Sequence, residues 1–270
     1  MKLLAYVDGI GVLGPGLGDW PEAAAVLSAR QAYRPAATVL PPPNVLAAAE
    51  RRRTGRVVKL ALAVALEATS RAGAEPAALA SVFSSSGGDG HNCHEICQAL
   101  AREGREISPT RFANSVHNAA AGYWSIATGA MAESNVLCAF DASFTAGLLE
   151  ALAQVAVDRE PVLLVAYDTE YPEPLHATRP IPDAFGVALV LTPERGPASL
   201  ASLEAELTDE ACDTLADPDL EALRRAIPAA RCLPMLERLA AGGKGRAVLE
   251  YLDVASVAVR IETWVAAKCV

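Results

Sequence analysis

The sequence predicts an α/β protein, in which short apolar strands alternate with helices along the chain. Strongly apolar runs at residues 80–86, 135–140, 161–167 and 186–191 indicate strands. Segments with helical spacing or many small residues lie between them or follow them, at residues 57–71, 89–102 and 143–157. Strands this apolar are typical of sheets that helices cover on both faces, so we expect a layered α/β architecture.

The N-terminal segment predicts a strand that enters a glycine-rich loop. An apolar run at residues 3–7 is followed by Gly9, Gly11 and Gly14. These glycines fit the spacing of a dinucleotide-binding loop, but Pro15 follows where that motif needs a helix to begin. We therefore expect no dinucleotide site, and no other cofactor.

The middle of the chain predicts alternating helices and strands. The helix over 57–71 ends at Gly73, and Asp89 can cap a helix that runs to about residue 102. Residues 114–132 lack strand alternation and are rich in small side chains, which favours a buried helix. A buried strand over 135–140 then leads directly into the helix over 143–157.

The C-terminal part is less regular. Residues 199–223 hold eight acidic and no basic side chains, which we interpret as a solvated face. Residues 229–240 predict a helix closed by two glycines, and residues 254–261 alternate as a last strand. Because no repeat or linker is visible, we expect a single domain over residues 1–270.

Composition excludes several classes of protein. Hydrophobic residues make up 52% of the chain and charged residues 20%, which excludes wholesale disorder. The net charge of −9 argues against a basic surface for nucleic acid. Six scattered cysteines do not make a disulfide framework, and we expect most of them to be small core residues. The longest uncharged stretch carries many polar side chains, and no export signal is visible, so we expect no membrane span and a cytoplasmic location.

The strand–turn–helix over residues 136–149 is the place to look for a nucleophile. A sharp turn at this point lifts a side chain toward solvent, and the helix N-terminus favours an anion there. Cys138 lies in the strand, Asp141 in the turn and Ser143 at the helix start. We favour a helix-capping role for Asp141 over a catalytic base. Ser143 activated by His117 is the alternative, although nothing in the sequence fixes that geometry.

A second group of chemically capable side chains lies on the helix that begins after Asp89. On one helical face the spacing could bring together three metal ligands, drawn from His91, Cys93, His94 and Cys97. A closed zinc site normally takes two such pairs from separate segments, and no second pair is visible. We therefore favour core cysteines beside surface histidines over a metal site.

Taken in order, several segments resemble the N-terminal half of a β-ketoacyl synthase of the thiolase fold, and more narrowly its short chain-length-factor relatives. The resemblance covers about residues 1–195 and leaves 196–270 as a divergent extension. It is carried by the opening strand and glycines (3–16), the arginine-rich lead into the first helix (51–53), the next strand with its glycines (82–88), the segment before the turn (108–114, with Ala121 and Gly122), and a shortened closing strand (179–191).

This resemblance implies that a condensing ketosynthase would carry its catalytic cysteine where Asp141 lies. It also implies two histidines from glycine-rich loops of a second half, whereas the only histidine after Asp141 is His176. We therefore expect no condensing activity from the chain alone. The implied role is a non-catalytic chain-length-factor-like partner of a ketosynthase in type II polyketide, aryl polyene or fatty-acid-like biosynthesis. The alternative is a homodimeric acyl hydrolase or acyltransferase that uses Ser143 or Cys138.

The resemblance also implies an interface. Thiolase-fold proteins pair through the strand before the nucleophile turn, here residues 136–140, and the loop at 109–116 would reach toward the partner's acyl tunnel. An acidic acyl carrier protein would bind the complex, with Arg51 to Arg53 as one candidate docking site. The isolated chain could also form a homodimer. Cys138 should then be buried and poorly reactive, unlike Cys269. The candidate tunnel and interface residues are Phe112, Val116, Val136, Leu137, Cys138 and Phe140.

Overall fold

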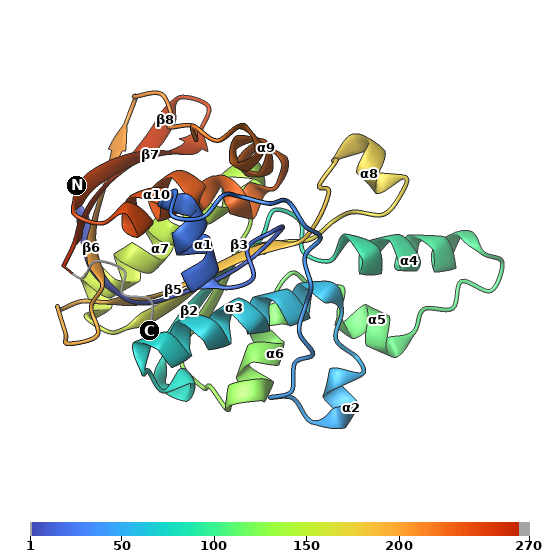
Figure 1. Ribbon diagram of the computed structural model, residues 1–270. Helices are drawn as coiled ribbons and strands as arrows, with labels where there is room; N and C mark the ends of the chain where they lie inside the picture. Colours follow the sequence, from blue (N-terminus) through green and yellow to red (C-terminus); the bar gives the residue numbers. More distant parts are fainter. Residues whose placement is uncertain (1, 265–270) are drawn as a thin grey trace.

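The protein has one eight-stranded sheet with helices packed on both faces (Figure 1). The computed structural model describes residues 2–264. The strand order is β3-β2-β4-β5-β1-β6-β8-β7, in which β3, β2 and β4 are parallel and all other neighbours are antiparallel. The strands are β1 (Leu3–Leu13), β2 (Ala80–Ser84), β3 (Ser134–Leu137), β4 (Val162–Asp168), β5 (Phe185–Thr192), β6 (Ala201–Thr208), β7 (Lys244–Leu252) and β8 (Ala255–Thr263).

The helices form two layers with separate apolar cores. Helices α1, α7 and α10 contribute to the core on one face of the sheet, and α3 and α6 to the core on the other. The α-helices are α1 (Trp20–Leu27), α2 (Ala48–Arg51), α3 (Arg56–Ala72), α4 (Gly90–Ala101), α5 (Pro109–Ala113), α6 (Ala119–Thr128), α7 (Ser143–Asp158), α8 (Leu175–Thr178), α9 (Pro218–Ala226) and α10 (Leu233–Ala241). The 3₁₀ helices are η1 (Pro76–Ala78), η2 (Phe140–Ala142) and η3 (Pro228–Cys232).

The central strands explain why the fold class could be predicted. Along β4, Val162 and Leu164 face the core of α7, while Leu163 and Val165 face the core of α3. All four are buried, so the strand is apolar on both faces. The predicted α/β architecture is confirmed, as are the helices at α3, α4 and α7 and the strands at β4 and β5.

The predicted glycine-rich loop is wrong at Gly9 and Gly11, because β1 continues through them to Leu13, and a turn begins only at Gly14. A Cβ atom at Gly11 would lie 2.1 Å from the carbonyl oxygen of Val64 in α3, and one at Gly9 would lie 2.1 Å from that of Ala68. The glycines therefore let the backbone of α3 approach the strand closely. Gly9 and Gly11 lie within β1 and not in a loop that leads into a helix.

The segment at 114–132 is not one helix, which corrects a second prediction. The chain forms α5, a turn, and then α6. In the turn, the Asn114 side chain donates to the carbonyl oxygen of Arg53 and accepts from the Tyr123 hydroxyl, and the Ser115 hydroxyl donates to the carbonyl oxygen of Phe112. Polar side chains that bond to nearby groups in this way compete with a continuous helix.

The acidic segment at 199–223 is more than a solvated face. It contains β6, which alternates buried residues (Ala201, Leu203 and Ala205) with partly exposed ones, and α9. The predicted helix over 229–240 is divided into η3 and α10, and the predicted last strand corresponds to β8. Strand β7 was not predicted from the sequence. Together these elements form a shortened C-terminal part on the β6 side of the sheet.

Helices α4 and α5 project from the body of the protein (Figure 1). We call residues 90–113 the arm. Asp89 caps α4 as predicted, because its carboxylate accepts from the backbone N–H of Asn92. Only Gly90 and Asn92 of α4 are buried. The arm is therefore attached at its base and lacks a covering layer in the described chain.

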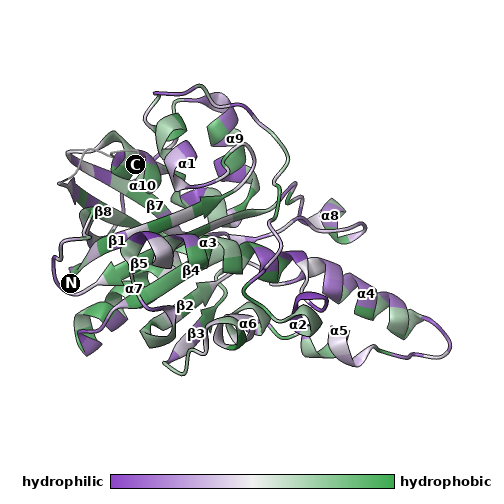
Figure 2. Cartoon of the chain, turned by 60° about the horizontal axis from the view of Figure 1, so that its bottom comes forward, coloured by the Kyte–Doolittle hydropathy of each residue, from purple (hydrophilic) through white to green (hydrophobic). Residues whose placement is uncertain are grey.

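Hydropathy follows the layers (Figure 2), with apolar strands in the centre and a mostly polar α4. Residues Phe140–Asp158, which include α7, are long and apolar enough to cross a membrane by length and composition alone. Half of this stretch is buried in the fold, where Phe144, Leu148 and Leu152 pack into the core beside the sheet. We therefore assign α7 as a core helix.

The close approach of α3 to β1 can be tested at Gly11. The substitution Gly11→Ala places a methyl group against the backbone of α3 and should lower the free energy of unfolding by about 3 kcal/mol. Gly122→Ala in α6 is the matched control, because its Cβ meets nothing within 4 Å and alanine should stabilise the helix by up to about 1 kcal/mol. Denaturant unfolding measures both, and equal effects would contradict this packing.

Candidate functional site

The turn after β3 is held by Ser143. Its hydroxyl donates to the carbonyl oxygen of Phe140 at 2.7 Å and accepts from the backbone N–H of Ala139 at 3.0 Å. Ser143 is 1% exposed. His117 instead lines a small cavity with Gly88 and Tyr167. The structure therefore does not bring Ser143 and His117 together, and the serine hydroxyl serves the backbone of the turn.

Asp141 lies between two arginines. Its Oδ1 accepts from Nη2 of Arg179 at 2.8 Å, and its Oδ2 accepts from Nη2 of Arg231 at 2.9 Å. Arg231 also pairs with Glu250 through Nη1. We call these four residues the Asp141 cluster. The predicted capping role is wrong, since the N-cap of α7 is Ala142 and no side chain caps this helix.

The Asp141 cluster joins distant parts of the chain. Arg179 follows α8, Arg231 lies in η3, and Glu250 lies in β7. The guanidinium group of Arg179 also stacks 3.8 Å above the ring of Phe140, whose φ angle is +52°. Both oxygens of the Asp141 carboxylate are occupied by guanidinium groups, and the two arginines balance the two carboxylates in charge. The position therefore offers neither a thiolate nor a free base.

A second carboxylate, Asp168, is buried beside the turn. Its Oδ1 accepts from the backbone N–H and the hydroxyl of Ser86, at 2.8 and 2.7 Å, and its Oδ2 accepts from the backbone N–H of Ala229 at 2.9 Å. Burial raises the pKa of Asp168 to about 6, although these hydrogen bonds lower it. Asp168 thus ties the end of β4 to the segment after β2 and to η3. The sequence did not lead us to Asp168, although an aspartate that ends an apolar strand is a signal that could have found it.

Cys138 is exposed in the described chain, and its predicted burial at a subunit interface stays a prediction because no partner chain is present. Its Sγ donates to the carbonyl oxygen of Ser86 at 3.2 Å. Among the cysteines in residues 2–264 only Cys232 is buried, so the expectation of mostly core cysteines is wrong. Cys269 lies outside the described residues.

The candidate metal ligands on α4 do not form a site. Cys93 and Cys97 are exposed, and His91 lies 3.7 Å from a carboxylate oxygen of Glu170. Partial desolvation of the Cys93 thiol and the neighbouring Cys97 raise the pKa of Cys93, which disfavours the thiolate that would bind metal. Within residues 2–264, no group of three or more His, Cys, Asp or Glu side chains is placed to hold a metal ion. Among these residues, the fold therefore places no set of further metal ligands around His94.

The strand that precedes the turn lies at the edge of the sheet. In β3, Ser134 and Asn135 are exposed, and Val136 and Leu137 are half-buried, so the predicted buried strand is wrong for the described chain. Its outer side pairs with no strand within residues 2–264. Phe140, in η2 rather than in the strand, is exposed. An edge of this kind presents free backbone donors and acceptors.

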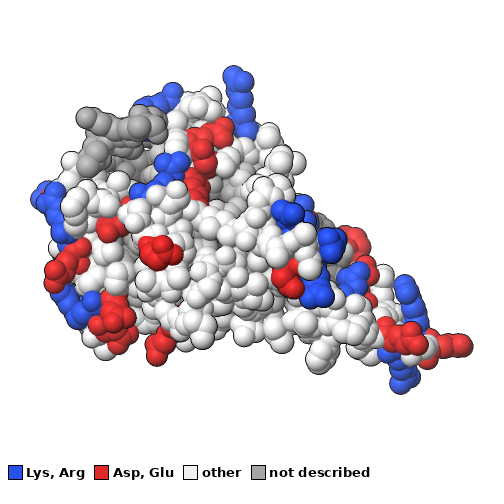
Figure 3. All heavy atoms as spheres, turned by 90° about the horizontal axis from the view of Figure 1, so that it is seen from below, with Lys and Arg blue, Asp and Glu red and all other residues white. Residues whose placement is uncertain are grey.

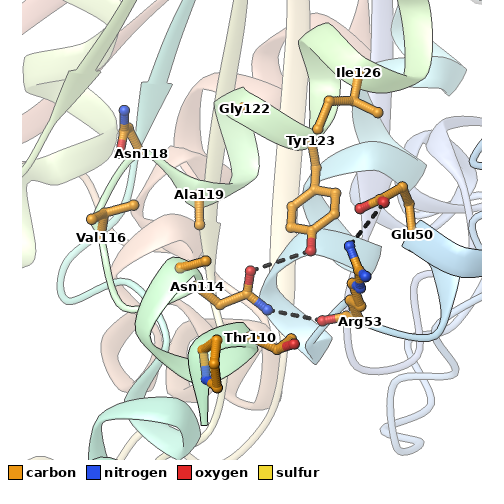
Figure 4. Close-up of a pocket in the computed structure, with 12 residues that line it drawn as sticks. Glu50, Arg53, Thr110, Asn114, Val116, Asn118, Ala119, Gly122, Tyr123 and Ile126 are labelled. Atoms are coloured by element: carbon orange, nitrogen blue, oxygen red, sulfur yellow. Dashed lines mark hydrogen bonds and ion pairs between the residues drawn. The ribbon is translucent and has the colours of Figure 1, made fainter. Parts of the chain in front are cut away.

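The other candidate interface residues lie near the base of the arm. Phe112 is 68% exposed and Val116 is 52% exposed. Val116 also lines a groove of about 480 Å³ between α2, α5 and α6 (Figure 4). The structure thus separates two groups of predicted residues, one at the turn and edge strand and one at the arm and groove.

Comparison with known proteins gives the family. The model of the β-ketoacyl synthase N-terminal domain matches residues 22–241, which is most of the chain. The chain belongs to the β-ketoacyl synthase family. The resemblance drawn from the sequence is confirmed, including the fold of a ketosynthase N-terminal half. No curated protein sequence matches this ketosynthase-family chain.

Solved ketosynthase structures are similar over nearly the whole chain. A structure of the ketosynthase ApeO in complex with its chain length factor ApeC from Xenorhabdus doucetiae has 25% identity and a TM-score of 0.72, covering 96% of this chain and 99% of that one. The ishigamide ketosynthase/chain length factor has 15% identity and a TM-score of 0.70, covering 97% and 99%. In a structure of a type II polyketide synthase acyl carrier protein in complex with its ketosynthase, the matched chain has 12% identity and a TM-score of 0.72. The match covers 98% of this chain and 100% of that one. The last two support the fold alone.

The Asp141 cluster should stabilise the fold. Asp141→Asn removes the negative charge that Arg179 and Arg231 share, and we expect the free energy of unfolding to fall by about 2 kcal/mol. Glu194→Gln is the matched control, because its pair with Arg159 is exposed on both sides and should contribute less than about 0.5 kcal/mol. Denaturant unfolding compares them, and an Asp141→Asn effect as small as that of the control would contradict a structural role.

Asp168 should make stability depend on pH. Its pKa in the folded protein, about 6, lies above the ordinary value of 3.8, so the folded state holds the proton more tightly than the unfolded state. Its stabilising contribution is complete below about pH 4 and is lost as the pH rises through 6. The difference in unfolding free energy between wild type and Asp168→Asn should therefore fall by about 2.4 kcal/mol from pH 4 to pH 7. A difference that stays constant over this range would show that Asp168 titrates normally.

Proposed function

We propose that this chain is a non-catalytic, chain-length-factor-like subunit that pairs with a ketosynthase in type II polyketide, aryl polyene or fatty-acid-like biosynthesis. The Asp141 cluster carries the proposal. At the position where a condensing ketosynthase resembling this chain would carry a cysteine, the carboxylate is held by Arg179 and Arg231. A subunit without a nucleophile contributes to condensation only through a partner that has one.

The open edge of the sheet supports the pairing. Addition of a partner's strand to β3 would satisfy its backbone groups and continue the sheet. The solved structure of ApeO with its chain length factor ApeC is a complex of a ketosynthase with such a subunit, and the matched chain there is about as long as this one. Exposed Val116 and Phe112 at the base of the arm are then the candidates for lining or limiting the partner's acyl tunnel.

The finer parts of the proposal concern domain organisation, carrier protein and location. We propose that residues 1–270 act as one domain in the cytoplasm, and that an acyl carrier protein binds the complex. Figure 3 shows a group of Lys or Arg side chains, with acidic side chains beside it, on the side seen from below. Arg52 and Arg53, which follow α2, are exposed, although Arg53 also pairs with Glu50. The carrier proteins of such systems are acidic, so these arginines are the candidate contact.

The competing function, a homodimeric hydrolase or acyltransferase, has less support. Ser143 is buried and its hydroxyl bonds to the backbone of the turn. Cys138 is exposed, but its thiol donates to the carbonyl oxygen of Ser86, and no histidine bonds to it among the described residues. An acyl thioester would leave a covalent adduct on either residue, which mass spectrometry of the treated protein detects. We expect no adduct.

Pairing can be tested by co-expression with the ketosynthase encoded nearby. The wild-type chain should co-purify with it, and condensation should require the ketosynthase. The chain alone should show no condensation, and Asp141→Cys should not confer it, because one restored thiol leaves the developing oxyanion unstabilised. Condensation by the wild-type chain alone would contradict the non-catalytic role.

The edge strand can be tested with Val136→Asp, which places a charge at the joint and should abolish the complex. Val39→Asp is the matched control, because Val39 is 81% exposed between α1 and α2 and lines a hollow with Val12 of β1 and Glu67 of α3 rather than with the turn or β3. Val136 packs partly against the core of α3 and α6, so circular dichroism of the isolated variant establishes that it is folded. If a folded Val136→Asp chain still forms a complex of wild-type mass by light scattering, the interface with the ketosynthase does not lie at β3.

A further inference from the structure

A groove of about 480 Å³ lies beside α6, on the side of the molecule that carries the arm. Its floor and walls come from α2, α5, the turn after α5, and α6, and Figure 4 shows Gly122 and Ala119 along one wall with Val116 and Ile126 at the ends. The groove is open to solvent, and Ile126 is 60% exposed. Nothing within residues 2–264 covers it.

Four of the polar side chains that line the groove are engaged within its wall, whereas Asn118 and Thr110 make no hydrogen bond with their side chains among the described residues. The Tyr123 hydroxyl donates to Oδ1 of Asn114, Nδ2 of Asn114 donates to the carbonyl oxygen of Arg53, and Arg53 pairs with Glu50 at 3.1 Å (Figure 4). Both charges and the Tyr123 and Asn114 side chains are therefore engaged within the wall. What the groove offers to an occupant is mainly apolar surface, from Val116, Ile126, Ala119 and the bare backbone of Gly122.

The groove lies along the same side of the molecule as the open edge strand. In Figure 2, β3, α6 and α5 follow one another along one border, and the view from below in Figure 3 shows few charged side chains across the middle of this side. Exposed apolar residues also gather in this part of the chain, at Phe112, Val116, Ile126, Met131 and Phe140. A single partner seated on β3 would extend naturally over α6.

We propose that this groove receives apolar side chains from the ketosynthase partner, from the element that covers the strand added beside β3. This inference rests on the proposed function and adds the site at which side chains of the partner contact the helical layer. A strand added to β3 would continue the face on which Phe83 and Val136 pack into the core shared with α6, so that face of the added strand needs a cover as well. That cover lies next to α6, and the groove is the hollow available to its side chains.

Gly122 makes the site testable without disturbing the fold. It lies inside α6, its φ angle is not in the left-handed region, and an added Cβ meets nothing within 4 Å. A helix interior ordinarily favours other residues over glycine. Gly122→Trp therefore fills the groove from its own wall, whereas Gly122→Ala adds only a methyl group.

The experiment measures binding of each chain to the purified ketosynthase by titration, with thermal unfolding of each isolated chain beside it. We expect Gly122→Ala to bind like wild type, and Gly122→Trp to keep its melting temperature but bind the ketosynthase at least about tenfold more weakly. Ile126→Glu, which places a charge on an exposed position of the groove, should weaken binding similarly. Val157→Trp on the exposed end of α7 is the control for a bulky side chain elsewhere and should bind like wild type.

The outcomes separate this inference from the proposed function. If wild type binds, Val136→Asp does not, and both Gly122→Trp and Ile126→Glu bind like wild type, the groove is not part of the joint while the pairing role stands. If Gly122→Trp disrupts only a homodimer of the isolated chain, the occupant is a second copy and the inference is overturned. If wild type fails to bind the ketosynthase, the proposed function and this inference are both wrong.

Discussion

The ion pairs of Asp141 with Arg179 and Arg231 hold together parts of the chain that are distant in sequence. They fasten the turn after β3 to the loop after α8 and to η3, so the edge strand and the shortened C-terminal part are joined at one point. Asp168 reinforces the same junction from within, because it holds the segment after β2 and the start of η3 together. The turn after β3 therefore acts as a structural anchor.

Around this anchor the chain keeps the fold of the ketosynthase family. The apolar cores on both sides of the sheet are complete around β4 and β5, and α7 is held between the sheet and η3. What the described chain leaves uncovered is the β3 edge, the arm and the groove at Gly122. These surfaces lie together, and a protein with an anchored turn and an open edge is suited to assembly with a partner.

How far the sequence could predict this arrangement depended on the range of each interaction. The helix α3 and the strands β4 and β5 were predictable because their apolar patterns and end signals are local. Strand β6 was hidden, because acidic side chains occupy its alternate positions. Gly9 and Gly11 suggested a loop, because the backbone of α3 that requires them is more than fifty residues away. The partners of Asp141 lie 38 and 90 residues along the chain, and no local pattern reveals such a pair.

The central claim, that β3 is the edge to which a ketosynthase adds its own strand, is tested most directly by amide hydrogen exchange of the chain alone and in the complex. The two edges of the sheet provide an internal comparison, since β3 and β7 both lack an outer neighbour among the described residues. Exchange at Ser134–Leu137 should slow markedly on addition of the ketosynthase, while exchange in the first half of β7, residues 244–248, should stay unchanged. Unchanged exchange in β3 within a formed complex, or slowing confined to β7, would contradict the account.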